Sequence, residues 1–259
     1  MMKALYFKEL LEVRWKLIIV LLITVIVAVP LPFMFDLFKS SVHMFTEDLF
    51  MDIPMLKIFQ QQIEAQASSF NLYLWANWYG KNLPQMILVL AAVIGGPMLA
   101  GESASGTFRF LLSKPISRRQ VFLAKYAAGA TATAVLSVVS TIALLISTKA
   151  AGQSVGVLWF LAPQPAQILG GLCLLSIALW LSARIDDSVV AGVVAVGVGI
   201  ALAIVDSFGP LKGRLIFGLM AESRSLTTGV PNSVSIVILA VVAGLIGYDA
   251  FRAFRKKDL

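Results

Sequence analysis

Long, uninterrupted apolar stretches dominate the chain, and polar positions gather between them. Six such stretches cover about residues 17–38, 83–100, 126–148, 166–183, 188–205 and 233–250. A hydrocarbon core about 30 Å thick is crossed by a helix of roughly 20 apolar residues, whereas the strands of a membrane β-barrel are segments of about ten residues that alternate in polarity. The pattern therefore predicts an all-α polytopic membrane protein with six transmembrane helices.

A shorter periodic segment precedes the first span. Residues 1–16 include KALYFKELLEVRWK, in which Lys8, Glu9, Glu12 and Lys16 lie near one helical face and apolar side chains lie opposite. Such a face predicts an amphipathic elbow helix at the membrane surface.

Prolines and glycines predict interruptions in two spans. Pro30 and Pro32 fall near the end of the first span, where a proline removes a backbone donor and kinks or breaks a helix. The triplet Gly95-Gly96-Pro97 predicts that the second span ends or bends before the connector that follows it.

Two longer segments are predicted on the outer side of the membrane. Residues 39–81 mix apolar and charged positions, which predicts one or two short helices, and this segment holds the lone His43, a poor basis for a metal site. Residues 206–232 are moderately apolar and could dip back into the membrane where protein covers the backbone. The first segment ends in aromatic residues that predict an interfacial belt: Tyr73, Trp75, Trp78 and Tyr79.

Composition and charge fix the compartment and the orientation. Apolar residues make up 59% of the 259 residues and charged residues 14%, against roughly 25% charged residues in soluble domains, so residues 1–259 are interpreted as a single membrane domain. With both termini placed in the cytoplasm, fourteen of the 21 Lys and Arg residues lie on the inner side, as the positive-inside rule requires. The protein is therefore expected in the cytoplasmic membrane with lipid, and not nucleic acid, as the partner of its basic charge.

The sequence offers no pattern for covalent chemistry or ion coupling. The predicted span interiors hold no Asp, Glu, Lys, Arg or His, the residues that proton relays place at membrane depth. Metalloprotease, serine-hydrolase and phosphate-loop motifs are absent from the sequence. The single cysteine, Cys173, falls inside a span and allows no intrachain disulfide. We expect a protein without enzymatic activity, bound cofactor or metal.

The connector GESASGTFRFLLSKPISRRQVFLAK, residues 101–125, carries the most specific pattern. Phe108, Leu111 and Leu112 at i, i+3 and i+4 predict a short helix, which Pro115 prevents from continuing. The spacing Ser117-x-x-Gln predicts a capping box that starts a second helix.

Arg118 and Arg119 fall in the first turn of that second helix, where the helix dipole disfavours cations. A topology signal and a surface facing an acidic partner explain this placement equally well from the sequence.

This connector resembles the cytoplasmic connector of ABC type-2 exporter permeases, the membrane subunits of two-component ATP-binding-cassette transporters. The residues that carry the resemblance are Gly101, Glu102, Gly106, Thr107, Leu111, Leu112, Pro115, Ser117, Arg118, Arg119 and Lys125. Six spans, an amphipathic first helix, a large loop after span one and a basic C-terminus agree with it.

The resemblance implies that the connector is a coupling helix inserted into a separate ATPase subunit. By position, the residues contacting the ATPase would be Thr107, Phe108, Arg109, Leu111 and Leu112, with Glu102 anchoring the base of the helix and Arg118 and Arg119 flanking the interface. Gly106 and Pro115 belong to the same coupling segment. Arg109 stands where many relatives carry an acidic or neutral residue, which leaves the local charge pairing open.

The function implied is that of a permease subunit in an ATP-driven exporter, paired with a second permease copy or homologue. ATP and Mg²⁺ would bind to the partner ATPase. Two alternatives stay open: a mechanotransmitting or metal-site-maturation subunit that acts on an extracytoplasmic partner through residues 39–81, and a structural or assembly membrane protein without an ATPase. The sequence leaves the substrate open.

Overall fold

The computed structural model describes residues 2–45, 54–104, 116–208, 211–221 and 228–256, and within these ranges the regular secondary structure is helical. Six of the described helical stretches are long and apolar enough to cross a membrane, which confirms the predicted all-α architecture with six spans. The helices at their centres are α1 Met2–Ala28, α5 Leu83–Ala104, α7 Arg118–Ala150, α9 Gln164–Ser182, α10 Ser188–Ser207 and α13 Ser233–Lys256.

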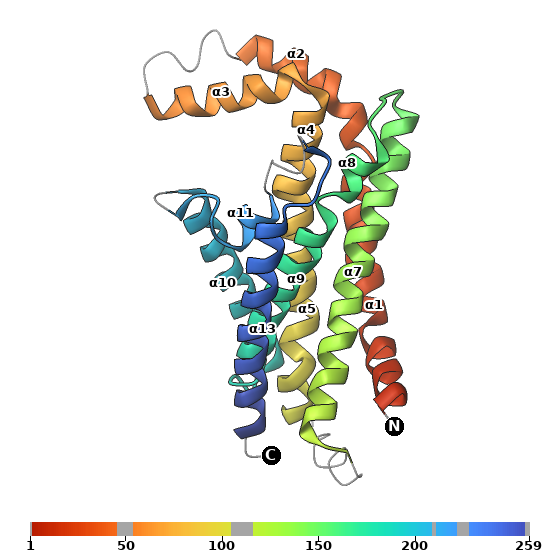
Figure 1. Ribbon diagram of the computed structural model, residues 1–259, viewed down its shortest axis with the longest axis vertical. Coiled ribbons are helices and arrows are strands. Elements are labelled where there is room, and N and C mark those ends of the chain that lie inside the picture. The colour runs from red at the N-terminus through yellow and green to blue at the C-terminus, as the bar shows by residue number, and fades with distance from the viewer. Residues whose placement is uncertain (1, 46–53, 105–115, 209–210, 222–227, 257–259) are drawn as a thin grey trace.

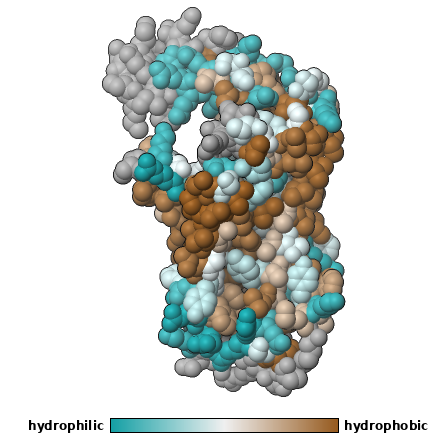
Figure 2. Space-filling model, viewed as in Figure 1, coloured by the Kyte–Doolittle hydropathy of each residue, from teal (hydrophilic) through white to brown (hydrophobic). Residues whose placement is uncertain are grey.

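These six helices form one elongated bundle, in which α5 and α9 lie at the centre (Figure 1). Helix α1 packs on α7, α10 packs on α5, and α13 packs on α9. The first residues of α1 and the last of α13 lie at the same end of the bundle, together with the end of α5 and the start of α7. We call this end the base. Figure 2 shows hydrophobic residues gathered around the middle of the molecule and hydrophilic residues toward both ends, as expected for a chain that crosses a bilayer.

Shorter helices build the end opposite the base. They are η1 Leu31–Met34, α2 Phe35–Phe45, α3 Pro54–Ser68, α4 Phe70–Asn77, the π-helix η2 Trp78–Asn82, α8 Val157–Leu161 and α11 Ile216–Met220. Helix α1 stops at Ala28, so the break predicted at Pro30 is confirmed. Residues 39–81 hold more helices than the one or two predicted, since α3, α4, η2 and the end of α2 lie there. Helices α2 and α3 extend sideways beyond the spans (Figure 1).

The first helix differs from its predicted form. Residues 2–16 continue into the first span without interruption, so a separate elbow helix is not confirmed. Glu9 is only 1% exposed, whereas Phe7 and Leu11 are 61% and 59% exposed. A lipid-facing surface is apolar, and this explains why the apolar side faces outward while a polar residue faces the bundle.

The Gly95-Gly96-Pro97 triplet neither ends α5 nor stands outside it, because the helix continues to Ala104. The predicted end at this point was wrong, and the alternative, a bend of the helix at the triplet, stays a prediction. The two glycines mark places where α5 approaches its neighbours closely, and a side chain from α9 bonds to the backbone groups near the proline, as described below.

Three of the four aromatic residues predicted to form an interfacial belt are buried in the bundle, and the fourth, Trp75, is partly buried. Tyr73, Trp78 and Tyr79 are buried. The indole Nε1 of Trp78 donates to Thr141 Oγ1 at 3.3 Å, and the Tyr79 hydroxyl donates to the main-chain oxygen of Phe160 at 2.8 Å. These side chains pack η2 against α7 and α8 because each brings a large apolar ring and one polar atom with a partner.

The segment after α10 folds back on the bundle. The buried Asp206 carboxylate accepts hydrogen bonds from the backbone N–H groups of Leu215 and Gly218. Ile216 and Met220 are buried, and α11 packs on α9. Whether this segment enters the bilayer stays a prediction.

Candidate coupling site at the base of the bundle

The predicted coupling segment joins two central elements of the bundle. Its N-terminal attachment is α5, with Glu102 in the last turn, and its C-terminal attachment is α7. Residues 105–115 lie outside the described residues, so the predictions for this stretch stay predictions; they concern Gly106, Thr107, Phe108, Arg109, Leu111, Leu112 and Pro115. The contacts of Glu102 are outside the described part as well.

The start of α7 follows the sequence prediction closely. Ser117 Oγ accepts a hydrogen bond from the Gln120 backbone N–H at 3.3 Å, and Gln120 Oε1 accepts one from the Ser117 N–H at 3.0 Å. This reciprocal capping box satisfies two donors at the helix start. It fixes where α7 begins, so residues 118–125 of the coupling segment belong to α7.

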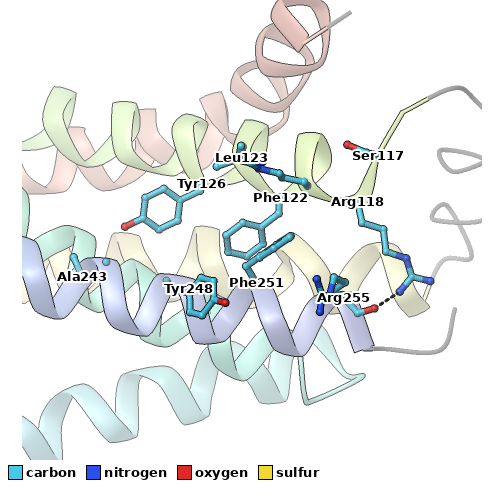
Figure 3. A pocket seen from close by; sticks show the side chains of 12 residues that line it. Ser117, Arg118, Phe122, Leu123, Tyr126, Ala243, Tyr248, Phe251 and Arg255 are labelled. Carbon is cyan, nitrogen blue, oxygen red and sulfur yellow. Dashed lines mark hydrogen bonds between the residues drawn. The ribbon is translucent and has the colours of Figure 1, made fainter.

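Arg118 has a structural role that the sequence did not reveal. One guanidinium N–H donates to the main-chain oxygen of Arg255 at 2.9 Å, in the last turn of α13 (Figure 3). The last carbonyl groups of a helix lack intrahelical partners, and a cation beside them is favourable. Arg118 therefore ties the base of α7 to the end of α13. Arg118 and the neighbouring Arg119 both line a groove between α7 and α13.

Close helix packing surrounds the lower half of α5. A Cβ added at Gly96 would lie 2.6 Å from Gly192 Cα on α10, and one added at Gly95 would lie 2.6 Å from Ala178 Cβ on α9. Such small residues let helix backbones approach closely in membranes. The triplet that looked like a helix terminator thus places α5 directly against both α9 and α10.

Ser182, at the end of α9, inserts its hydroxyl into the backbone of α5. The hydroxyl donates to the Gly96 carbonyl oxygen and accepts from the N–H groups of Leu99 and Ala100 at 3.1 and 2.9 Å. Pro97 lies between these groups, and a Ser side chain commonly satisfies backbone groups freed near a proline in membrane helices. Pro97 has no N–H to donate, so the hydrogen-bond ladder of α5 is incomplete here, four residues before the coupling segment begins at Gly101.

A buried ion pair joins α1 to α7 near the base. Lys125 Nζ lies 2.8 Å from Glu9 Oε2, and each residue is 1% exposed. Tyr6 and Thr131 add a hydroxyl–hydroxyl hydrogen bond of 2.8 Å between the same two helices. From the sequence, Lys125 was expected among the cytoplasmic cations and Glu9 on a surface face, and their pairing was not predicted. A sequence pattern did not reveal this contact because the residues are 116 positions apart.

Within the described residues, no group of three or more His, Cys, Asp or Glu residues is placed to hold a metal ion. Cys173 is buried and donates to the Leu239 carbonyl oxygen at 3.3 Å. The linkages described at the base join α7 to α13 and α1 to α7.

Part of the chain matches a known protein family. Residues 5–208 match the family model described as ABC-2 family transporter protein. The matched range includes α1, α5, α7, α9 and α10, and it also includes the whole of residues 101–125. No curated protein matches the chain.

Proposed function

The chain belongs to the ABC-2 family of transporter membrane proteins, and we propose that it is the permease subunit of an ATP-driven exporter whose ATPase is a separate chain. The observation that carries this proposal is the family match across the first five spans and the connector together. ATP and Mg²⁺ would bind to the partner ATPase, because the sequence has no phosphate loop of its own.

In the proposed mechanism the coupling segment, residues 101–125, inserts into the ATPase at the cytoplasmic side. The base of the bundle is then the cytoplasmic end, in keeping with the excess of Lys and Arg that the sequence places there. Closure of the ATPase pair around ATP would displace the segment. Two permease chains, identical or homologous, would respond together and enclose the translocation pathway between them.

The position of α5 supports such transmission. This helix packs against α1, α7, α9 and α10, so a displacement at its lower end is passed to most of the bundle. The interruption held by Ser182 lies between the coupling segment and the rest of α5. A helix bends most readily where its hydrogen-bond ladder is interrupted, and we assign the bending point of the mechanism to this place.

Loss of coupling is expected when the predicted contact face of the segment is changed. The variant Phe108→Ala with Leu112→Asp removes an aromatic anchor and places a charge at an apolar contact, changes that typically cost an interface several kcal/mol. We expect the purified complex to lose the ATPase subunit, or to keep it with ATP hydrolysis reduced at least tenfold. The measurement is co-purification with the ATPase encoded beside this chain, followed by a hydrolysis assay.

The matched control is Phe110→Ala, an equivalent truncation in the same segment outside the i, i+3, i+4 face. It should retain both the ATPase and most of the hydrolysis. A double variant that behaves like the wild type would contradict the coupling assignment and favour a membrane protein that works without an ATPase.

A second candidate function rests on the arm formed by α2 and α3. These helices extend beyond the spans at the end opposite the base (Figure 1), which suits a subunit that passes motion to an extracytoplasmic partner. Under this alternative the coupling variant would still abolish hydrolysis. The distinguishing observation is an extracytoplasmic protein that is retained with the chain and lost when exposed α3 residues such as Gln61 and Glu64 are changed.

A further inference from the structure

A groove runs along the lower part of the bundle between α7 and α13. It has a volume of about 770 Å³ and is open to the surroundings. Figure 3 shows its wall on one side formed by α7 residues such as Phe122 and Tyr126, and on the other by α13 residues such as Tyr248 and Phe251. The Phe122 and Phe251 rings lie 5.5 Å apart between the two helices.

Small residues on α13 create the hollow. Ala243, Gly244 and Gly247 line it. A Cβ added at Gly244 would meet no atom within 4 Å, whereas one added at Gly247 would lie 3.5 Å from the Tyr126 ring. The groove is therefore unfilled beside Gly244 and closed by the Tyr126 ring beside Gly247. The unfilled part is wide enough for an acyl chain.

Positive charge is concentrated at the end of this groove nearest the base. Arg118, Arg119 and Arg255 line that end, and among the described lining residues none is acidic. The nearby carboxylate on α13, Asp249, is engaged on the α9 side, where it accepts from Trp180 Nε1 at 2.6 Å and from Arg184 at 3.1 Å. The N-terminal dipole of α7 adds to the positive potential.

Three positive side chains at one end of the groove attract an anion to that end. Arg118 and Arg119 stand at a helix start, where cations are disfavoured, and the Arg255 side chain joins them at the same end of the groove (Figure 3). The hydrogen bond to α13 explains the position of Arg118 alone, because it uses the main-chain oxygen of Arg255. Arg255 stands in the last turn of α13, where a cation is favourable, whereas Arg119 stands at a helix start, where a cation is not favourable.

We propose that the groove binds an anionic phospholipid, with its phosphate beside Arg119 and Arg255 and one acyl chain along Phe122 and Gly244. From Arg255 to Ala243 the helix rises about 18 Å, close to the half-thickness of about 15 Å of a hydrocarbon core. Basic pockets between membrane helices on the cytoplasmic side suit anionic headgroups. The bound lipid bridges α7 and α13 at the base, and its presence does not depend on the ATPase.

The test measures lipid binding to the full chain in detergent by native mass spectrometry, with phosphatidylglycerol and phosphatidylcholine of identical acyl chains as the probes. We expect phosphatidylglycerol to bind at least tenfold more tightly. The variant Arg119→Gln with Arg255→Gln should lower the preference for phosphatidylglycerol about tenfold, because it deletes both arginine charges proposed to bind the phosphate. The main-chain oxygen that accepts from Arg118 is kept. Gly244→Leu should weaken both lipids by filling the space of the acyl chain.

The matched control for Gly244→Leu is Gly197→Leu on α10, where an added Cβ also meets no atom within 4 Å. The matched control for the arginine variant is Arg252→Gln on α13, since Arg252 is not among the groove-lining residues. Both should bind lipid like the wild type. Equal binding of the two lipids, or unchanged binding in the arginine variant, overturns the proposal. Displacement of the lipid by millimolar glycerol 3-phosphate would also overturn it, because a headgroup alone would then suffice. If Gly244→Leu does not fold, the proposal is tested by the lipid preference of the variant Arg119→Gln with Arg255→Gln.

Discussion

Replacing Lys125 with methionine is expected to remove most of the heat-stable folded protein. The change leaves the Glu9 carboxylate, 1% exposed, without the ammonium group that lies 2.8 Å away. Breaking a buried ion pair by removing one partner costs about 3–5 kcal/mol. Lys8 remains 3.5 Å from Glu9 and offsets part of its charge, although the Lys8 side chain is 41% exposed. We therefore expect the free energy of unfolding to fall by about 3 kcal/mol, the lower end of this range. The measurement is the monodisperse fraction after heating in detergent, followed by size-exclusion chromatography.

Two further variants separate the buried pair from charge effects in general. Glu9→Gln combined with Lys125→Met removes both charges and should recover much of the lost stability, because no uncompensated charge remains buried. Glu12→Gln breaks the Lys8–Glu12 pair, whose side chains are 41% and 50% exposed, and should change stability by less than about 1 kcal/mol. A Lys125→Met protein as stable as the Glu12→Gln protein would show that the linkage between α1 and α7 has little energetic weight.

Gly96→Val is the second substitution with a large expected effect. Its Cβ would lie 2.6 Å from Gly192 Cα and 2.7 Å from the Gly192 backbone nitrogen. Since the obstacle is backbone and not a movable side chain, α5 and α10 must separate, which should cost about 3 kcal/mol or more. The same heating assay should show a marked loss of monodisperse protein.

The control for this substitution is Gly197→Val on α10. A Cβ at Gly197 meets no atom within 4 Å, so the same change of residue type meets no obstacle and should be tolerated. Comparable stability of the two variants would contradict the close approach of α5 and α10, and with it the position of α5 at the centre of the bundle.

Features set by local sequence were predictable. The six spans follow from continuous apolar length, and the end of α1 follows from Pro30, which cannot donate to the helix ladder. The capping box at Ser117 and Gln120 needs only neighbouring residues and was predicted in detail.

Features set by helix packing were not predictable from the pattern of apolar residues. In a bilayer the exterior is as apolar as the interior, so hydrophobicity does not tell which face of a span is buried. Glu9 therefore looked like a surface residue, although it faces α7. Likewise, Gly96 and Ser182 gain their roles from residues more than eighty positions away. The sequence did hold one indication of this packing: Ser182 is a polar residue at the end of an apolar span, and its hydroxyl needs a hydrogen-bond partner.

The coupling of residues 101–125 to a separate ATPase is tested most directly by a cross-link from Phe108→Cys. The native Cys173 is buried, so the introduced thiol is the one that reacts in this chain. The matched control is Leu158→Cys, at an exposed position on α8 at the opposite end of the bundle (Figure 1). A thiol-reactive photo-cross-linker should join the Phe108→Cys chain, and not the Leu158→Cys chain, to the co-purified ATPase. A retained ATPase that cross-links to neither position, or to Leu158→Cys instead, would contradict the account.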